Sequence, residues 1–307
     1  MHYVSDFASK QYPEVNFKFH ITSNLYKLPS DFVDYAHKYN LTILCEIAGT
    51  PEIHDKLRPN RAGKPTCDKI VKNIHFLIKE GFNINIRATI TSHNHDKLLE
   101  ISKFHKEIGG NSIAYVLLNP VNSDEMIMSK DWLPDVDVYL SGLQQILFNK
   151  VWGIDKIFPL NEYIRKIGNN NINNCNCGAP YGNTPTIDVN GNMYPCIYWV
   201  GMPKFLAGNV FDEGDLSNIS LCHDLQNKLN VENRNDCKNC KWKYICGGGC
   251  AVNYVPLLYK FENFNKIDPI IRKYMLKFSC KLSSGCLSIV LWDQIHKKNF
   301  DLKNIKI

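Results

Sequence analysis

Four cysteines stand close together in the run CKNCKWKYICGGGC, residues 237–250, which also contains three consecutive glycines. Thiolates are soft ligands, and thiols at such short spacing are typical of metal or iron–sulfur sites. Paired cysteines most often bind zinc, but zinc ribbons space their two pairs evenly, whereas this run reads Cys-x2-Cys-x5-Cys-x3-Cys. Glycines present a small, backbone-rich surface that lets amide N–H groups approach sulfur closely. The run therefore favours an iron–sulfur cluster over zinc.

The chain as a whole has the composition of an ordinary globular protein, with 307 residues, 44% hydrophobic and 21% charged. Its net charge of +6 comes from 36 basic and 30 acidic residues without a long basic run, so no nucleic-acid partner is expected. No stretch of about 18 apolar residues occurs, and MHYVSDFASK lacks the apolar core of a signal peptide. We therefore expect a cytoplasmic protein with no membrane partner. Because disulfides are rare in that reducing compartment, the 12 cysteines indicate metal or redox chemistry.

Elements of two kinds alternate in the first 120 residues. Apolar residues at helical spacing predict helices at 66–81 and 96–109, each ended by a glycine. Strands alternating with helices imply an α/β fold with a parallel sheet and helices packed outside it. A closed barrel of eight such units needs about 250 residues, so an open sheet with an unpaired first strand is expected here. Short runs rich in β-branched and aromatic residues predict the strands at 16–22, 41–47, 83–91 and 112–118.

Two further regions follow the sheet, so we expect three parts, residues 1–123, 124–172 and 173–307. Residues 124–172 predict a mostly helical linker that ends at the polar run GNNNINN. In the third part, TPTIDV and MYPCIYW flank NGN and predict a β-hairpin. Regular apolar runs are scarce there, so burial alone would stabilise it poorly, and metal ligation can supply folding energy. The buried stripe of the linker is expected to consist of Trp132, Leu140, Leu143, Ile146 and Leu147.

The cysteines outside the run complete a longer pattern. Cys177-x13-Gly191-x4-Cys196 precedes the run, and Cys280 follows it. This order resembles the seven-cysteine SPASM domain of radical SAM peptide and protein maturases, among them the anaerobic sulfatase-maturating enzymes. The resemblance implies a SPASM-like domain with two auxiliary [4Fe-4S] clusters. It implies that one cluster is held by Cys237, Cys240, Cys246 and Cys280, and the other by Cys177, Cys196 and Cys250.

Two positions in this ligand set stay open. The second cluster needs a fourth ligand, and Cys175 is the nearest candidate, although its Cys-x-Cys spacing is tighter than the usual arrangement of the family. For the first cluster, Cys286 competes with Cys280 for the closing position. Three more cysteines lie within strand or helix patterns and are interpreted as buried structural thiols, namely Cys45, Cys67 and Cys222.

The front half resembles the barrel of the same family. ITSNLYKL is similar to its Thr-Asn-Gly strand end, here Ser23, Asn24 and Leu25. INIRATIT is similar to the strand whose arginine, here Arg87, lies close to S-adenosylmethionine. The resemblance implies a partial radical SAM (β/α) barrel in which Asn24 and Arg87 bind the cofactor. For Arg87, a solvated or ion-paired residue at a strand end is an equal alternative.

The segment EIAGTPEIHDKLRPNRAGKPTCDKI is similar to the family's Ser-x-Asp-Gly-Pro loop, which runs into His-Asp and Arg. The matching residues here are His54, Asp55 and Arg58, while the serine and aspartate positions carry Glu46 and Ala48. A hydroxyl near the cofactor and a carboxylate near the substrate are thereby lost. His54 and Asp55 either take part in catalysis or cap and orient the loop before the helix at 66.

Two other parts of the family pattern are not found. No Cys-x3-Cys-x2-Cys triplet for the catalytic cluster occurs, and the family's glycine-rich second-strand motif is absent as well, since the sequence begins close to where the third barrel strand belongs. The catalytic residues and the binding of S-adenosylmethionine therefore stay open. In one hypothesis, the chain is part of a split radical SAM maturase of a peptide or protein, and a second polypeptide supplies the missing strands and the catalytic cluster. In another, it is a non-catalytic iron–sulfur accessory protein for substrate binding or electron transfer; the third is a truncated gene product.

Overall fold

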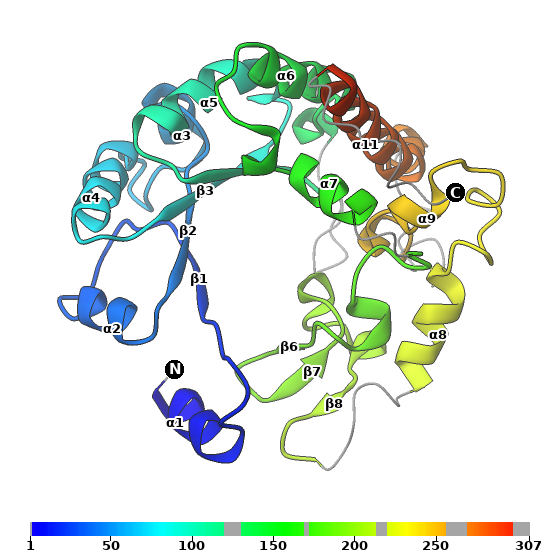
Figure 1. Ribbon diagram of the computed structural model, residues 1–307, viewed down its shortest axis with the longest axis horizontal. Helices are drawn as coiled ribbons and strands as arrows, with labels where there is room; N and C mark the ends of the chain where they lie inside the picture. The colour runs from blue at the N-terminus through cyan, green and yellow to red at the C-terminus, as the bar shows by residue number, and fades with distance from the viewer. Residues whose placement is uncertain (1, 120–129, 169–171, 213–219, 256–268, 297–307) are drawn as a thin grey trace. The chain divides into compact units, whose positions relative to one another are not determined.

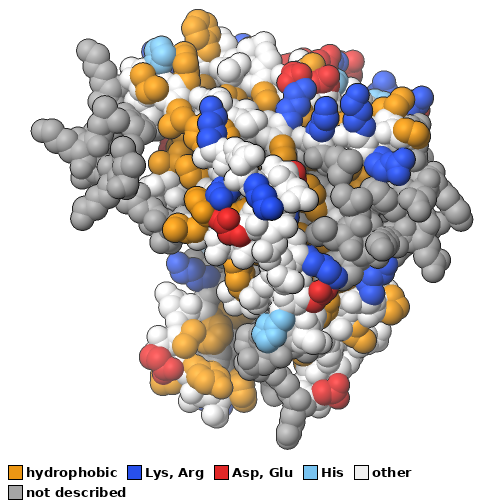
Figure 2. All heavy atoms as spheres, turned by 90° about the vertical axis from the view of Figure 1, so that its right-hand side faces the viewer, with side chains coloured by type: hydrophobic (Ala, Val, Ile, Leu, Met, Phe, Trp, Pro, Cys, Tyr) orange, Lys and Arg blue, Asp and Glu red, His pale blue; other side chains and the backbone are white. Residues whose placement is uncertain are grey.

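The computed structural model describes residues 2–119, 130–168, 172–212, 220–255 and 269–296. The chain divides into two compact units. The N-terminal unit consists of residues 1–117 and 137–161, and the C-terminal unit of residues 118–136 and 162–307. None of the described helices is both long and apolar enough to span a bilayer. On the face seen in Figure 2, lysine and arginine side chains are spread between hydrophobic and uncharged ones.

A parallel sheet of five strands forms the centre of the N-terminal unit, in the order β1-β2-β3-β4-β5. The α/β fold and the four predicted strands are confirmed, and among the described strands β1 pairs with β2 alone, so it is an edge. The predicted start of the first strand at residue 16 is wrong, because β1 begins at His20. The fifth strand was missed, since two residues are too short to show a periodicity. The strands are β1 (His20–Ser23), β2 (Thr42–Glu46), β3 (Ile84–Ile90), β4 (Ser112–Leu117) and β5 (Ile157–Phe158).

Helices cover one face of this sheet and line the outer arc of the unit in Figure 1. The buried Tyr115 of β4 contacts His105 of α5, with 3.3 Å between the hydroxyl and Nδ1, so the buried side chains face the helices. In β3, buried residues alternate with partly exposed ones, and the partly exposed set is polar: Asn85, Arg87 and Thr89. The sheet therefore has a polar second face. The helices of this unit are α1 (His2–Gln11), α2 (Phe32–Lys38), α3 (Pro51–Leu57), α4 (Cys67–Lys79), α5 (Leu98–Glu107) and α6 (Val136–Phe148).

The two helices predicted from glycine endings are confirmed as α4 and α5. Gly81 and Gly109 follow their last turns with φ of 89° and 88°, a left-handed conformation that glycine adopts without strain. The Gly81 N–H donates to the carbonyl of Ile78, and the next N–H donates to Leu77. These bonds satisfy carbonyl groups at the helix end and direct the chain into β3.

The predicted linker is divided between the two units, and its residues 124–129 and 169–171 lie outside the described part of the chain. Leu143 and Ile146 of α6 are buried as expected, and Leu140 and Leu147 are partly buried. Trp132 is 37% exposed, so its place in the buried stripe is wrong. It precedes α6, whose buried stripe includes Tyr139 instead, since Tyr139 lies four residues before Leu143 on the same face. Gly142 brings α6 close to α5, because an added Cβ would lie 2.8 Å from Leu98 Cβ.

The C-terminal unit contains the predicted hairpin, formed by β6 (Thr186–Ile187) and β7 (Asn192–Tyr194), with β8 (Gly208–Asn209) pairing on the other side of β7. It also has an apolar core that the sequence did not predict, in which Trp199 stacks on Phe205 with ring centres 4.8 Å apart. Its residues come from loops and from several helices, so no single segment shows a regular apolar pattern. The helices are α7 (Leu160–Gly168), α8 (Ser220–Leu229), α9 (Lys243–Cys246) and α11 (Pro269–His296).

Candidate metal centres and the sheet edge

The three glycines after Cys246 form a left-handed segment, with φ of 65°, 81° and 76° at Gly247, Gly248 and Gly249. A Cβ on Gly247 would lie 2.7 Å from backbone atoms of Asn176, and one on Gly248 would lie 2.7 Å from the Arg234 guanidinium. A Cβ on Gly249 would lie 2.6 Å from the Ser279 side chain. Glycine is therefore required at each position for both conformation and space. The segment holds three distant parts of the C-terminal unit against one another.

Four thiols line one cavity of about 40 Å³ in the C-terminal unit. They come from the loop before α9, from the end of α9 and from the middle of α11. The rest of the lining includes two charged residues, Asp236 and Lys243. Burial raises the pKa of the Cys237 thiol to about 11, and the neighbouring charges of Cys280 and Cys246 contribute to the rise. Cys286 is fully buried and does not belong to the described lining of this cavity. The cavity-lining thiols, called here the first thiol group, are Cys237, Cys240, Cys246 and Cys280.

A second thiol group consists of Cys177, Cys196 and Cys250. Burial, together with the charges of Cys196 and Cys177, raises the pKa of Cys250 to about 12. The pKa of Cys196 is likewise raised by burial first, and the charge of Cys177 also contributes. These three sulfur atoms are thus electrostatic neighbours. Burial, with the charge of Cys177, also raises the pKa of Cys175, while the Tyr181 hydroxyl lowers it; Cys175 differs from the other three in belonging to the apolar core.

The four thiols of the first group line a cavity and do not converge on a single point. Within the described ranges, no group of three or more His, Cys, Asp or Glu side chains is arranged to hold a single metal ion. Tetrahedral zinc would need its sulfur ligands about 2.3 Å from one centre. The remaining isolated cysteines, Cys45, Cys67 and Cys222, are buried in β2, α4 and α8, which confirms their interpretation as buried thiols.

Arg234 links the segments that carry the first thiol group. Its Nη1 donates to the Gly248 carbonyl at 2.8 Å, and Nη2 pairs with Asp236 at 2.6 Å, beside Cys237. Its guanidinium lies 3.6 Å from the centre of the Tyr254 ring, and the Tyr254 hydroxyl is 3.5 Å from the Cys280 sulfur. Hydrogen bonds of this kind fix the loops that carry the thiols.

A carboxylate network lies at the carboxyl edge of the parallel sheet in the N-terminal unit. Glu46 ends β2 and is paired in register with Arg87 of β3, and its side chain is only 12% exposed. Its Oε1 accepts from Arg58 Nη2 at 2.8 Å, from the Thr89 hydroxyl at 2.8 Å and from the Thr89 N–H at 3.2 Å. Its Oε2 lies 3.3 Å from Arg87 Nε. Arg87 is therefore ion-paired, with a partner that the sequence did not identify, and its contact with a cofactor stays a prediction.

His54 and Asp55 orient the loop before α4, as one of the two interpretations predicted. His54 is 1% exposed; its Nδ1 accepts from the Ala48 N–H at 3.0 Å, and its Nε2 lies 3.1 Å from the Thr66 hydroxyl. Since Thr66 donates to the Arg58 carbonyl, the proton of neutral His54 belongs on Nε2. Burial lowers the pKa of His54 to about 4. Asp55 Oδ1 accepts from the N–H groups of Thr66 and Cys67 at 2.7 and 2.9 Å and so caps α4.

Asn24 lies at the same edge, just after β1. Ser23 is in register with Cys45, which places Asn24 level with Glu46. Its Oδ1 accepts from the Tyr26 N–H at 3.1 Å, so the side chain stabilises the turn. Leu25 stands where the family pattern has glycine, and it keeps a left-handed backbone with φ of 51°. The two proposed cofactor-binding residues, Asn24 and Arg87, therefore share one edge with Glu46 between them.

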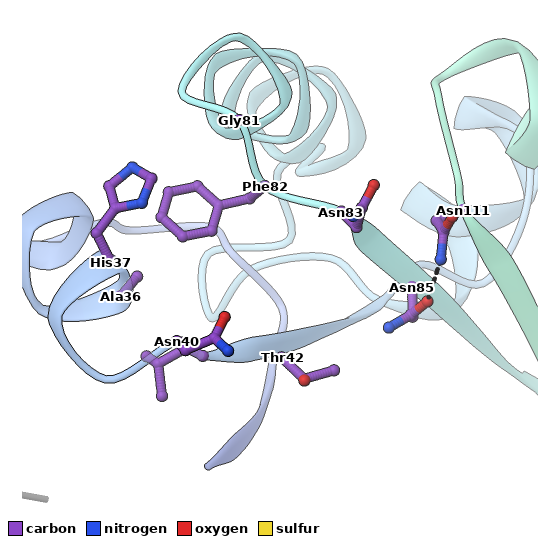
Figure 3. A pocket seen from close by; sticks show the side chains of 10 residues that line it. Ala36, His37, Asn40, Thr42, Gly81, Phe82, Asn83, Asn85 and Asn111 are labelled. Atoms are coloured by element: carbon purple, nitrogen blue, oxygen red, sulfur yellow. Dashed lines mark hydrogen bonds between the residues drawn. The ribbon is translucent and has the colours of Figure 1, made fainter. Parts of the chain in front are cut away.

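A second cavity, of about 340 Å³, lies at the opposite, amino edge of the sheet (Figure 3). Its polar lining is neutral and rich in amides, and Asn111 Nδ2 donates to Asn85 Oδ1 at 3.2 Å. Sequence reasoning missed this cavity, although an asparagine stands at or just before the start of each of three strands. These asparagines are Asn40, Asn83, Asn85 and Asn111.

The parallel sheet with outer helices, followed by a cysteine-rich unit, is a fold shared with two groups of solved structures. A solved anSMEcpe with bound AdoMet and Kp18Cys peptide superposes with a TM-score of 0.68 at 18% identity, over 92% of this chain and 80% of that one. Streptococcus suis SuiB superposes with a TM-score of 0.56 at 19% identity, over 78% of this chain and 57% of that one.

Sequence comparison indicates the same relationship, although no family model matches the chain. A cysteine-type anaerobic sulfatase-maturating enzyme of Clostridium novyi is 24% identical over 281 residues, which span 88% of this chain and 73% of the relative. A serine-type anaerobic sulfatase-maturating enzyme of Bacteroides thetaiotaomicron is 22% identical over 256 residues, spanning 76% of this chain and 60% of the relative. The chain is thus a relative of the anaerobic sulfatase-maturating enzymes.

Proposed function

We propose that the chain is an iron–sulfur protein of the radical SAM/SPASM type that takes part in the radical modification of a peptide or protein. The observation that carries this proposal is the first thiol group, whose four cysteines surround one cavity. The relatives are consistent with it, since they are named sulfatase-maturating enzymes and the solved SuiB structures include one bound to the precursor peptide SuiA. A peptide or protein is accordingly the proposed substrate.

In this proposal the two thiol groups hold two auxiliary [4Fe-4S] clusters. A cavity walled by four thiols suits a cluster of several irons better than one zinc ion. Cys280 is favoured over Cys286 as the closing ligand, because only Cys280 lines the described cavity. Cys175 is a poor fourth ligand for the second group, because its sulfur is turned to Tyr181 in the apolar core. When bound, such clusters supply one-electron transfer, while the residues of the chain provide the thiolates and the supporting hydrogen bonds.

The carboxyl edge of the sheet is the proposed place for S-adenosylmethionine. In enzymes built on parallel barrels, ligands bind at this edge of the strands. Asn24 and Arg87 lie there, and the single Glu46 carboxylate pairs with both Arg58 and Arg87, so the two guanidinium groups together keep one uncompensated positive charge. A cofactor carboxylate would compete with Glu46 for Arg87 Nε. The second candidate function is a non-catalytic accessory protein that binds substrate or passes electrons, and the existing ion pair of Arg87 is consistent with it.

The activity test uses the full chain, reconstituted anaerobically with iron and sulfide and reduced with dithionite. No Cys-x3-Cys-x2-Cys triplet occurs in the 307 residues, so we expect no 5'-deoxyadenosine from S-adenosylmethionine with the chain alone. In the split-enzyme form of the proposal, adding a polypeptide that carries the triplet starts turnover, and Arg87→Ala then lowers it. In the accessory form, no such addition starts turnover. Sustained 5'-deoxyadenosine formation by the chain alone would contradict both forms.

A further inference from the structure

Lys166 of α7 is a buried cation in the C-terminal unit. The residue is 7% exposed, and its ammonium donates to Asn176 Oδ1 at 2.9 Å and to the Asn176 carbonyl at 3.3 Å. Both acceptors are uncharged. A buried ammonium normally has a carboxylate partner, because removing a charge from water is costly. Lys166 therefore calls for a counter-charge that amide oxygens do not provide.

The nearest carboxylate on α7 already forms an ion pair with another side chain. Glu162 pairs with Arg165, with Oε1 2.6 Å from Nη2 and Oε2 3.1 Å from Nε. The Lys166 ammonium lies 5.8 Å from the centre of the Tyr163 ring. Within the described ranges, no carboxylate oxygen lies within ion-pair distance of Lys166.

The thiol groups lie on either side of the peptide that Lys166 holds. Asn176 directly precedes Cys177 of the second thiol group, and its backbone is packed against Gly247, which directly follows Cys246 of the first. Burial lowers the pKa of Lys166, and the charge of Glu162, followed by those of Cys246 and Cys177, opposes that shift. The cation thus stands between two sets of residues that become strongly negative when they ligate metal as thiolates.

We propose that Lys166 is the shared counter-charge of the two thiol groups and raises the reduction potential of the iron–sulfur clusters that they hold. The inference rests on the proposed function. Reduction adds one electron from an external reductant to a cluster, without forming or breaking a bond, and makes it more negative. A nearby cation in a medium of low dielectric constant stabilises that reduced state, and net charge is a known determinant of cluster potential. Lys166 also positions the Cys175–Cys177 segment through its two hydrogen bonds to Asn176.

The test compares the wild type with Lys166→Met, which removes the charge, and Lys166→Arg, which keeps it. Each full-length protein is reconstituted anaerobically, analysed for iron and sulfide, and titrated with dithionite while the reduced clusters are followed by electron paramagnetic resonance. We expect the midpoint potentials of both clusters to fall in Lys166→Met and to stay near the wild-type values in Lys166→Arg. As a control, Lys103→Met removes the same charge from an exposed position of the N-terminal unit and should leave the potentials unchanged.

Each outcome of this test either supports or overturns the role inferred for Lys166. Unchanged potentials in a Lys166→Met protein with full iron content would overturn the inference. If Lys166→Met loses iron, retention of iron by Lys166→Arg supports a charge requirement, whereas loss in both variants shows that packing alone is at stake and overturns it. The proposed function is judged separately by the wild type, which contradicts it if it binds neither iron nor sulfide.

Discussion

The two units of the chain are held together in different ways. The N-terminal unit is a parallel sheet in which one face of the strands is buried against helices, as the alternation in β3 shows. The C-terminal unit has short strands of two or three residues and a left-handed glycine segment, with thiols from distant segments around one cavity. Regular burial stabilises the first unit without any ligand, whereas the second combines an apolar core with residues suited to ligation. Substitutions and changes of pH should therefore affect the stability of the two units differently.

The largest expected effect follows from removing a thiol of the first group. Cys246→Ala should lower the iron content of the anaerobically purified protein and destabilise the C-terminal unit, because a cluster ties loops that are far apart in sequence. Hydrogen exchange should speed up in the C-terminal unit and stay unchanged in β2 and β3. As a control, Cys222→Ala removes a buried thiol of α8 in the same unit and should keep the iron. Stoichiometric zinc with negligible sulfide in the wild type would show the cluster assignment to be wrong.

A smaller effect is expected from Gly247→Ala. The added methyl would meet the Asn176 backbone at 2.7 Å, and alanine would be held at φ of 65°. We expect the free energy of unfolding of the C-terminal unit to fall by at least about 1–3 kcal/mol, the usual cost of a strained residue, with the clash adding to it. Gly201→Ala is the matched control, because Gly201 has φ of 84° and open space around its Cα. Equal losses in the two variants, measured by urea unfolding, would mean that the close approach to Asn176 has no energetic weight.

The stability of the N-terminal unit should depend on pH through His54. His54 is neutral in the folded protein, with its pKa lowered from 6.5 to about 4, mainly by burial. The unfolded state therefore binds the extra proton between these values, and stability that is complete above pH 6.5 is lost as the pH falls toward 4. Between pH 7 and pH 5 this amounts to about 2 kcal/mol, at roughly 1.4 kcal/mol per pH unit below 6.5. Urea unfolding at the two pH values should show a smaller loss for His54→Gln than for the wild type, and an unchanged loss would contradict the assignment.

The sequence predicted those features that local patterns encode. The apolar repeat of α4 and the β-branched runs of β2 to β4 depend on residues close together in the chain, and so does the turn at Gly191 between β6 and β7. The cysteine spacing also indicated which thiols could act together, since spacing within a short segment limits how far apart its ligands can be. Even so, β5 was missed, because a strand of two residues is defined by its pairing with β4 and not by its own composition.

By itself, then, the sequence determined the parallel α/β arrangement, the candidate thiols and the relationship to a family. Only the tertiary structure showed that Arg87 pairs with Glu46 and that Asp55 caps α4. It also showed that Cys280, and not Cys286, lines the cavity of the first thiol group. It also showed that Lys166 is buried with uncharged acceptors between the two thiol groups. The physical reason is that periodicity and turn chemistry act over a few residues, whereas ion pairs, burial and ligand sets depend on which distant segments the fold brings within a few ångströms of one another.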